Sequence, residues 1–362
     1  MCATGFIELE YEFNNQKGTC EICHQGQSSL MWEKKNYTIK FDTPITVQES
    51  WGPQTLYCLK ANFIDHTHSR NIVAARLWGE VVKTRPHIDE HLLLAPNYGA
   101  IDGFPFELIV NDEFYGLYTW NIPQAGWMLG MKDTEGVHQC FVGASSDTKG
   151  SCFRGIATFR RNIDYKIEYC ATQDNSWVRP SLNNMLLTVS QSNGQNLEPD
   201  IADLVDLESA IDYMIYSCLI TNEDGLTKNF QLATYDGIKW IFSAYDLDAS
   251  FGLWWNGKNY VAPDNCINFS SWNTKNYLMR LLLEYKSAII AQRYYELKNT
   301  VLSEDNIVSS FNNFINSIPE EVKKKDLEKW TNIPSLDKNN LDQIVKHYRT
   351  KVEILDQQIK SF

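Results

Sequence analysis

The stretch TNEDGLTKNFQLATYDGIKWIFSAYDLDASFG, residues 221–252, constrains this chain more than any other part of its sequence. It places Asp224 and Asn229 five positions apart, continues through two strand-like runs, and ends with Asp246 and Asp248 just before a Phe-Gly pair. Asp and Asn near turns usually serve as caps or turn formers. Four of them in this order, around a pair of strands, indicate instead a metal site with a carboxylate beside it.

The spacing Asp-x-x-x-x-Asn is also that of the catalytic loop of protein kinases. There, a carboxylate orients the attacking hydroxyl, while the amide and a later strand-end carboxylate hold Mg²⁺. Asp224, Asn229 and Asp246 follow this order, and Asp248 stands beside the last of them. Asp-x-Asp pairs also mark metal-dependent glycosyltransferases, so Asp246 and Asp248 alone do not distinguish such an enzyme from a kinase. Such a transferase does not require the upstream Asp and Asn, and the full set therefore favours phosphoryl transfer.

Composition narrows the class of partner. The chain has 362 residues and a formal net charge of -12, with 43% hydrophobic and 22% charged residues, as in an ordinary globular protein. This charge argues against nucleic acid or an anionic membrane as the main partner. The sequence shows no run of roughly 18 apolar residues and no secretory signal at its N-terminus. We therefore expect cytoplasmic synthesis, no membrane insertion and no nucleic-acid partner.

The pattern along the chain predicts an α+β fold. Alternating runs predict strands in the N-terminal part, including a hairpin over residues 104–120 that turns at Asn111-Asp112, and a 3.6-residue period predicts one helix over residues 70–82. Helical periods dominate from residue 181, with single helices expected over 278–298, 303–317 and 341–362. We expect four regions: 1–125, β-rich with one helix; 126–180, an irregular insertion or lid; 181–300, with the catalytic and metal motifs; and 301–362, a C-terminal helical extension.

Three lysines flank or lie in the predicted strand near residues 36–41, namely Lys34, Lys35 and Lys40. Charged residues on a strand usually form a solvated face. In a kinase, however, one strand lysine reaches the nucleotide phosphates and pairs with a helix glutamate. Glu80, on the predicted helix over residues 70–82, is the candidate for that partner, with a solvated helix charge as the alternative.

The cysteines and histidines give weaker signals. Nine scattered cysteines, an odd number, fit reduced thiols better than a disulfide framework. The run Cys20-Glu-Ile-Cys23-His24 matches the haem-attachment pattern formally, but without an export signal or a second ligand pair it favours a structural role. The pairs His66/His68 and 87/91 lack the general base that a zinc-peptidase motif would add.

Several segments resemble the CotH kinase family, the atypical kinases first known from bacterial spore coats. GQSSLMWEKKNYTIKF is similar to the family's Gly-x-Ser-Ser/Thr…Lys-Lys-x-Tyr-x-Ile/Leu-Lys segment, HSRNIVAARLWGEV to its Arg-Asn helix, and ELIVNDEFYGLYTW to its hairpin. The run DYMIYSCLITNEDGLTKNFQLATYDGIKWIFSAYDLDASFG resembles the family core almost continuously, and LMRLLLEYKSAIIAQRYYELKNTVLS the helices after it. The resemblance covers about residues 26–303. It implies a two-lobed, atypical protein-kinase-like fold with a β-rich N-terminal lobe and a helical C-terminal lobe.

The resemblance also implies roles for particular residues. Asp224 would orient the acceptor hydroxyl, Asn229 and Asp246 would bind the metal, and Asp248 would support or share a second metal. Lys35 is the first candidate among the three lysines for the phosphates. The implied cofactors are ATP and Mg²⁺, with Mn²⁺ as an alternative, and the implied acceptors are Ser or Thr hydroxyls of proteins.

Two positions depart from the family pattern. Asp112 occupies the hairpin turn where the family usually has glycine, a conservative change for a turn. Asn121 follows the hairpin where an acidic residue is common, which affects how the nucleotide site or the lobe interface is completed. The alternative to an enzyme is a catalytically inactive kinase-like domain, structural or binding, that assembles into a spore coat or phage tail particle. The 13% aromatic content, with Trp254-Trp255 after the metal motif, would suit a partner surface as well as a core.

Overall fold

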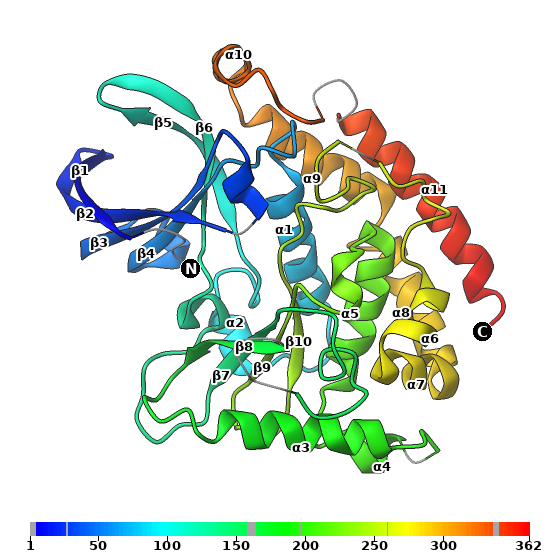
Figure 1. Cartoon of the computed structure of the whole chain (residues 1–362). Coiled ribbons are helices and arrows are strands. Elements are labelled where there is room, and N and C mark those ends of the chain that lie inside the picture. Colours follow the sequence, from blue (N-terminus) through cyan, green and yellow to red (C-terminus); the bar gives the residue numbers. More distant parts are fainter. Residues whose placement is uncertain (1–4, 27, 158–163, 196, 259, 336–339) are drawn as a thin grey trace.

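The computed structural model describes residues 5–26, 28–157, 164–195, 197–258, 260–335 and 340–362 (Figure 1). Strands gather in the N-terminal part and helices in the C-terminal part, so the expected α+β class is confirmed. A helix near the middle of the molecule, α1, separates the larger sheet from the C-terminal helices. The candidate site is positioned by this helix and by a second, smaller sheet.

The larger sheet has six antiparallel strands in the order β1-β2-β3-β4-β6-β5. Its hairpin β5–β6 turns at Asn111 and Asp112, both with left-handed φ values of 51° and 64°. Short polar residues tolerate this conformation. The predicted hairpin is therefore confirmed. The strands are β1 (Ile7–Phe13), β2 (Gln16–Gln25), β3 (Asn36–Thr46), β4 (Pro53–Lys60), β5 (Gly103–Val110) and β6 (Glu113–Asn121).

The smaller sheet has four antiparallel strands in the order β10-β9-β7-β8. The pair β9–β10 confirms the two strands expected within the central stretch. The region expected to be irregular, 126–180, supplies β7 and β8. Strand β7 is fully buried because it pairs with β9, a partner far along the chain that local patterns do not reveal. The strands are β7 (Cys140–Ala144), β8 (Tyr165–Cys170), β9 (Phe230–Thr234) and β10 (Ile241–Ala244).

Helix α1 confirms the helix expected over residues 70–82, and it is buried along most of its length. The helix expected over residues 278–298 is instead two helices, because the backbone at Lys286 leaves the helical region with φ -129° and ψ 19°. The α-helices are α1 (Arg70–Lys83), α2 (Glu90–Leu94), α3 (Val178–Gln191), α4 (Leu197–Ile201), α5 (Leu207–Ile220), α6 (Phe269–Lys275), α7 (Tyr277–Tyr285), α8 (Ser287–Asn299), α9 (Glu304–Asn316), α10 (Glu320–Lys329) and α11 (Leu341–Ile359). The 3-10 turns are η1 (Ser28–Met31), η2 (Glu49–Trp51), η3 (Gly126–Leu129) and η5 (Asp224–Leu226).

The helices connect the two sheets. α1 packs against α5 and α9, and α11 packs against α5 and α9 from the other side. Helix α10 reaches back over the larger sheet and packs on β6 (Figure 1). The C-terminal helices α9 to α11 therefore contact the N-terminal half of the fold as well as the region of the central stretch.

The structure also bears on the state of the cysteines and on membrane-spanning helices. Cys23 is disulfide-bonded, so the expectation of reduced thiols throughout is wrong at this position. Seven other cysteines of the described residues carry free thiols. None of the helices that the structure describes combines the length and apolar character needed to span a bilayer.

Candidate active site

The ends of β9 and β10 bring Asp224, Asn229 and Asp246 to one place. Asp224 opens the 3-10 turn η5, and Asn229 directly precedes β9. Asp246 lies two residues beyond β10. Because the strands are antiparallel, with Ala244 opposite Phe230, the start of β9 lies beside the end of β10. Pairing of two short strands is thus enough to join residues that are 22 positions apart in the sequence.

The Asn229 amide sits between the two carboxylates. Its Nδ2 donates to Asp224 Oδ2 at 3.2 Å and to Asp246 Oδ2 at 3.4 Å. The remaining Asp224 oxygen pairs with Lys228 Nζ at 3.1 Å. Because Lys228 and Asp224 are partly exposed, this ion pair is easily opened to solvent or to a bound molecule.

Two residues of the site and two close to them in sequence have a left-handed backbone. Asn229 and Asp246 have left-handed φ values of 56° and 58°, as do Thr221 at the end of α5 (58°) and Phe251 (52°). Non-glycine residues in this region cost about 1–3 kcal/mol each and persist only where their surroundings impose the conformation. Strain of this kind is typical of functional sites.

The carboxylates crowd negative charge into a partly buried space. Burial raises the pKa of the Asp246 carboxyl, and Asp224 adds to this rise while Lys60 and Lys228 oppose it. Burial likewise raises the pKa of Asp248 to about 7, with the Asp246 carboxylate as the next cause. A bound cation would relieve this repulsion, and carboxylate and amide oxygens are the ligands that Mg²⁺ prefers.

The donor set fits a metal that a substrate helps to bind. Within the described ranges, no three His, Cys, Asp or Glu side chains are arranged to hold a metal ion by themselves. This result covers the described histidine pairs considered for zinc. Mg²⁺ does not need such a cage, since it usually binds one or two carboxylates together with substrate phosphates and water. Asp246, Asp248 and Asn229 match that requirement.

The structure does not bring Lys34, Lys35 or Lys40 to this cluster. Lys34 is buried against Asp326 of α10, with Nζ–Oδ1 at 2.7 Å. Lys35 donates to the Leu30 carbonyl at 2.7 Å and to another backbone carbonyl of the same loop. Lys40 lies on the exposed face of β3, 3.3 Å from a glutamate of β2. All three lysines are therefore already paired with groups in the larger sheet, in its loops or on α10.

Glu80 is also occupied elsewhere. Its Oε2 accepts a hydrogen bond of 2.8 Å from Asn306 Nδ2 on α9. This contact lies toward the C-terminal end of α1, whereas the opposite end of that helix contacts the segment with Asp246. The expected pairing of Glu80 with a phosphate-binding lysine is not present in this arrangement.

Lys60 is a cation close to this cluster that no motif in the sequence indicates. It is the last residue of β4, and its charge opposes the pKa rise of both Asp246 and Asp248. Its ammonium is therefore within electrostatic reach of both carboxylates. No local pattern distinguishes Lys60 from the other lysines at strand ends, because the order of the strands in the sheet decides which of them lies near Asp246.

The chain was compared with known proteins. Residues 152–357, more than half of the chain, match the family model described as CotH kinase protein. The chain therefore belongs to the CotH kinase family. Asp224, Asn229, Asp246 and Asp248 all lie within the matched range, whereas Lys60 and the larger sheet precede it. No curated protein matches the chain in a sequence comparison.

Proposed function

We propose that this protein is a two-lobed atypical protein kinase that transfers the terminal phosphoryl group of ATP, with Mg²⁺, to a Ser or Thr hydroxyl of a protein. The observation that carries the proposal is the Asn229 amide held between Asp224 and Asp246. Phosphoryl transfer asks a protein for positioning and charge stabilisation more than for covalent chemistry. These residues, with Lys60 nearby, are of the kinds that this task requires.

Each residue has a distinct part in the proposed mechanism. Asp246, Asp248 and Asn229 would hold Mg²⁺, which when bound supplies positive charge against the phosphate oxygens. Asp224 accepts a hydrogen bond from the acceptor hydroxyl and orients it. Lys60, whose charge acts on Asp246 and Asp248, would bind phosphate oxygens. Lys228, once separated from Asp224, offers a second ammonium to the transferred group.

A titration of thermal stability with ATP tests the proposal. With Mg²⁺ present, ATP should raise the unfolding temperature of the wild-type protein, because a ligand that binds only the native state stabilises it by about 2.7 kcal/mol at 100 times its Kd. The shift should be absent without Mg²⁺ and in Asp246→Ala. The exposed Asp203 provides a matched control, since Asp203→Ala should keep the shift.

The competing proposal is an inactive kinase-like domain that binds partners within a coat or virion particle. It predicts that millimolar ATP does not change the unfolding temperature, with or without metal. It also predicts that the protein is found as a component of such a particle. That result would leave the motifs as a scaffold. A shift that needs Mg²⁺ would instead justify a search for the protein acceptor.

The lysine assignment has its own test. Lys60→Met should weaken ATP binding about 10- to 100-fold, the loss expected for one charged hydrogen bond of about 1.5–3 kcal/mol. Lys35→Met should bind ATP as the wild type does, because Lys35 is engaged with backbone carbonyls of its own loop. Isothermal titration calorimetry of ATP binding by both variants shows which lysine contributes to the affinity. Weaker binding in Lys35→Met alone would restore the assignment made from the sequence.

A further inference from the structure

One face of helix α11 carries polar side chains where a core-facing helix normally carries apolar ones. Gln343, His347 and Lys351 are spaced four residues apart, so they lie in one row along the helix. His347 is 6% exposed and Lys351 is fully buried at 0%. Burying such groups is costly unless they find partners. We call these three residues the α11 stripe.

The partners of the α11 stripe lie in the segment that follows Asp248. Gln343 Nε2 donates to the Phe251 carbonyl at 3.0 Å, and Lys351 Nζ donates to the Pro263 and Cys266 carbonyls at 3.1 and 3.2 Å. The His347 ring fills the space that a side chain at Gly252 would occupy. The stripe thus holds this segment at several points along its length.

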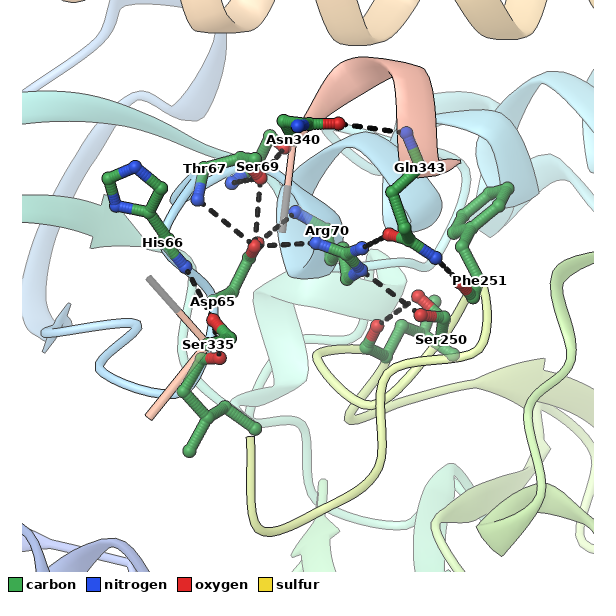
Figure 2. A network of polar contacts seen from close by, with 12 residues as sticks. Asp65, His66, Thr67, Ser69, Arg70, Ser250, Phe251, Ser335, Asn340 and Gln343 are labelled. Carbon is green, nitrogen blue, oxygen red and sulfur yellow. Dashed lines mark hydrogen bonds and ion pairs between the residues drawn. The ribbon is translucent and has the colours of Figure 1, made fainter. Parts of the chain in front are cut away.

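Helix α1 holds the same segment through Arg70, which lies beside Gln343 (Figure 2). Arg70, 0% exposed, donates from Nε to the Ser250 carbonyl at 3.1 Å and from Nη1 to Asp65 Oδ1 at 2.7 Å. The next residue, Asn71, accepts the Leu247 N–H at 3.2 Å. Leu247 stands between Asp246 and Asp248, two of the proposed metal ligands, so α1 contacts the backbone on both sides of Asp248.

Gln343 connects the contacts that α11 makes with this segment to those that α1 makes. Its Oε1 accepts from Arg70 Nη2 at 2.5 Å, while its Nε2 binds the Phe251 carbonyl (Figure 2). One amide therefore links α11, α1 and the segment. The left-handed backbone of Asp246 and Phe251 needs such external restraint to persist.

We infer that the α11 stripe, acting with Arg70, is a built-in clamp that holds Asp246 and Asp248 in their metal-binding arrangement. In many protein kinases the matching segment and helix are brought into place by phosphorylation. Here, hydrogen bonds from the C-terminal helix do so within the same chain, so the unphosphorylated protein is already competent. Gln343 is a positioning residue because it acts through the backbone next to the ligands, and Lys351 is one because it holds the same segment further along, at Pro263 and Cys266. This inference rests on the proposed function.

The test uses the full-length chain and two variants of the stripe, Gln343→Leu and Lys351→Met. The first readout is amide hydrogen exchange of residues 245–253 without nucleotide, which we expect to be at least about tenfold faster in Gln343→Leu. The second is the Mg²⁺ concentration that half-saturates the ATP-induced thermal shift, which should rise about tenfold, as for other residues that orient metal ligands. Gln343→Glu keeps the acceptor for Arg70 and should recover part of both effects.

Arg349→Ala is the matched control on the same helix, because Arg349 is exposed and pairs with Glu304 of α9. It should leave both readouts unchanged. Exchange and Mg²⁺ dependence equal to wild type in both stripe variants would overturn the clamp, as would a requirement for phosphorylation of the segment before ATP binds. If wild type fails to bind ATP, the proposed function falls, and the exchange measurement still decides the clamp.

Discussion

Asp246→Ala should reduce phosphoryl transfer by at least about 10³-fold, the scale seen when a main charge-stabilising group is removed. It should also abolish the stabilisation of the protein by ATP and Mg²⁺, because Asp246 is a proposed metal ligand. The stability of the protein alone should change little, because the relief of charge repulsion is opposed by the left-handed backbone at this position, which alanine tolerates less well than aspartate. Burial and the Asp224 carboxylate already raise the pKa of Asp246, so removing this carboxyl relieves repulsion.

Asp224→Ala separates the two carboxylate roles and serves as the partner variant. It should reduce the transfer rate about 10²- to 10⁴-fold, the usual contribution of a positioned acid or base. Its thermal shift with ATP and Mg²⁺ should stay close to wild type, because Asp224 pairs with Lys228 and is proposed to orient the acceptor, not to bind the metal. Phosphorylation is measured in single turnover on a generic protein acceptor or on the chain itself. Full activity in either variant would refute the site assignment.

The carboxylate and amide residues could be predicted because their geometry is local. Asp224, Asn229 and Asp246 come together through one strand pair, β9–β10, and the turns at its ends. Alternation and turn residues are visible in a single sequence. The hairpin at Asn111-Asp112 was predictable for the same reason.

The cation could not be predicted because its place depends on the whole sheet. Lys34, Lys35 and Lys60 all lie at or beside strand ends, and the strand order decides which of them brings its charge near Asp246. Lys34 forms its ion pair with Asp326, which is 292 residues further along the chain. Helix α10, which carries Asp326, has too few apolar positions to show a helical period, with Val322 as its buried apolar residue. Long-range pairings of this kind leave no local trace.

The pair Lys34–Asp326 should be among the most stability-critical contacts of the chain. The side chains are 1% and 2% exposed, and Asp326 Oδ1 also accepts the Leu117 N–H of β6 at 2.7 Å. Lys34 Nζ in turn donates to the Leu117 carbonyl at 2.6 Å. Asp326→Ala should therefore lower the free energy of unfolding by about 3–5 kcal/mol, because it leaves an ammonium buried without its counter-charge.

The pH dependence of this effect has a definite sign. Burial favours the neutral Asp326 carboxyl, but hydrogen bonding from His68 and the charge of Lys34 outweigh it and hold its pKa below the ordinary 3.8. A lowered pKa in the folded state gives stability that is complete above the unfolded value and is lost as the pH falls through the folded one. The difference between wild type and Asp326→Ala should therefore shrink below about pH 4, as urea unfolding at several pH values would show.

A double variant decides whether this pair stabilises the fold or fixes its arrangement. Burial lowers the pKa of Lys34 to about 8 despite the opposing charge of Asp326, so the attraction does not fully offset desolvation of the ammonium. We therefore expect Lys34→Met/Asp326→Leu to be more stable than either single variant, as is common when a buried pair is replaced by apolar residues. Lys324→Met, on the exposed face of α10, should change stability by no more than about 0.5 kcal/mol. If the double variant is instead the least stable, the pair contributes net stability, and Lys34 is a structural residue on energetic as well as geometric grounds.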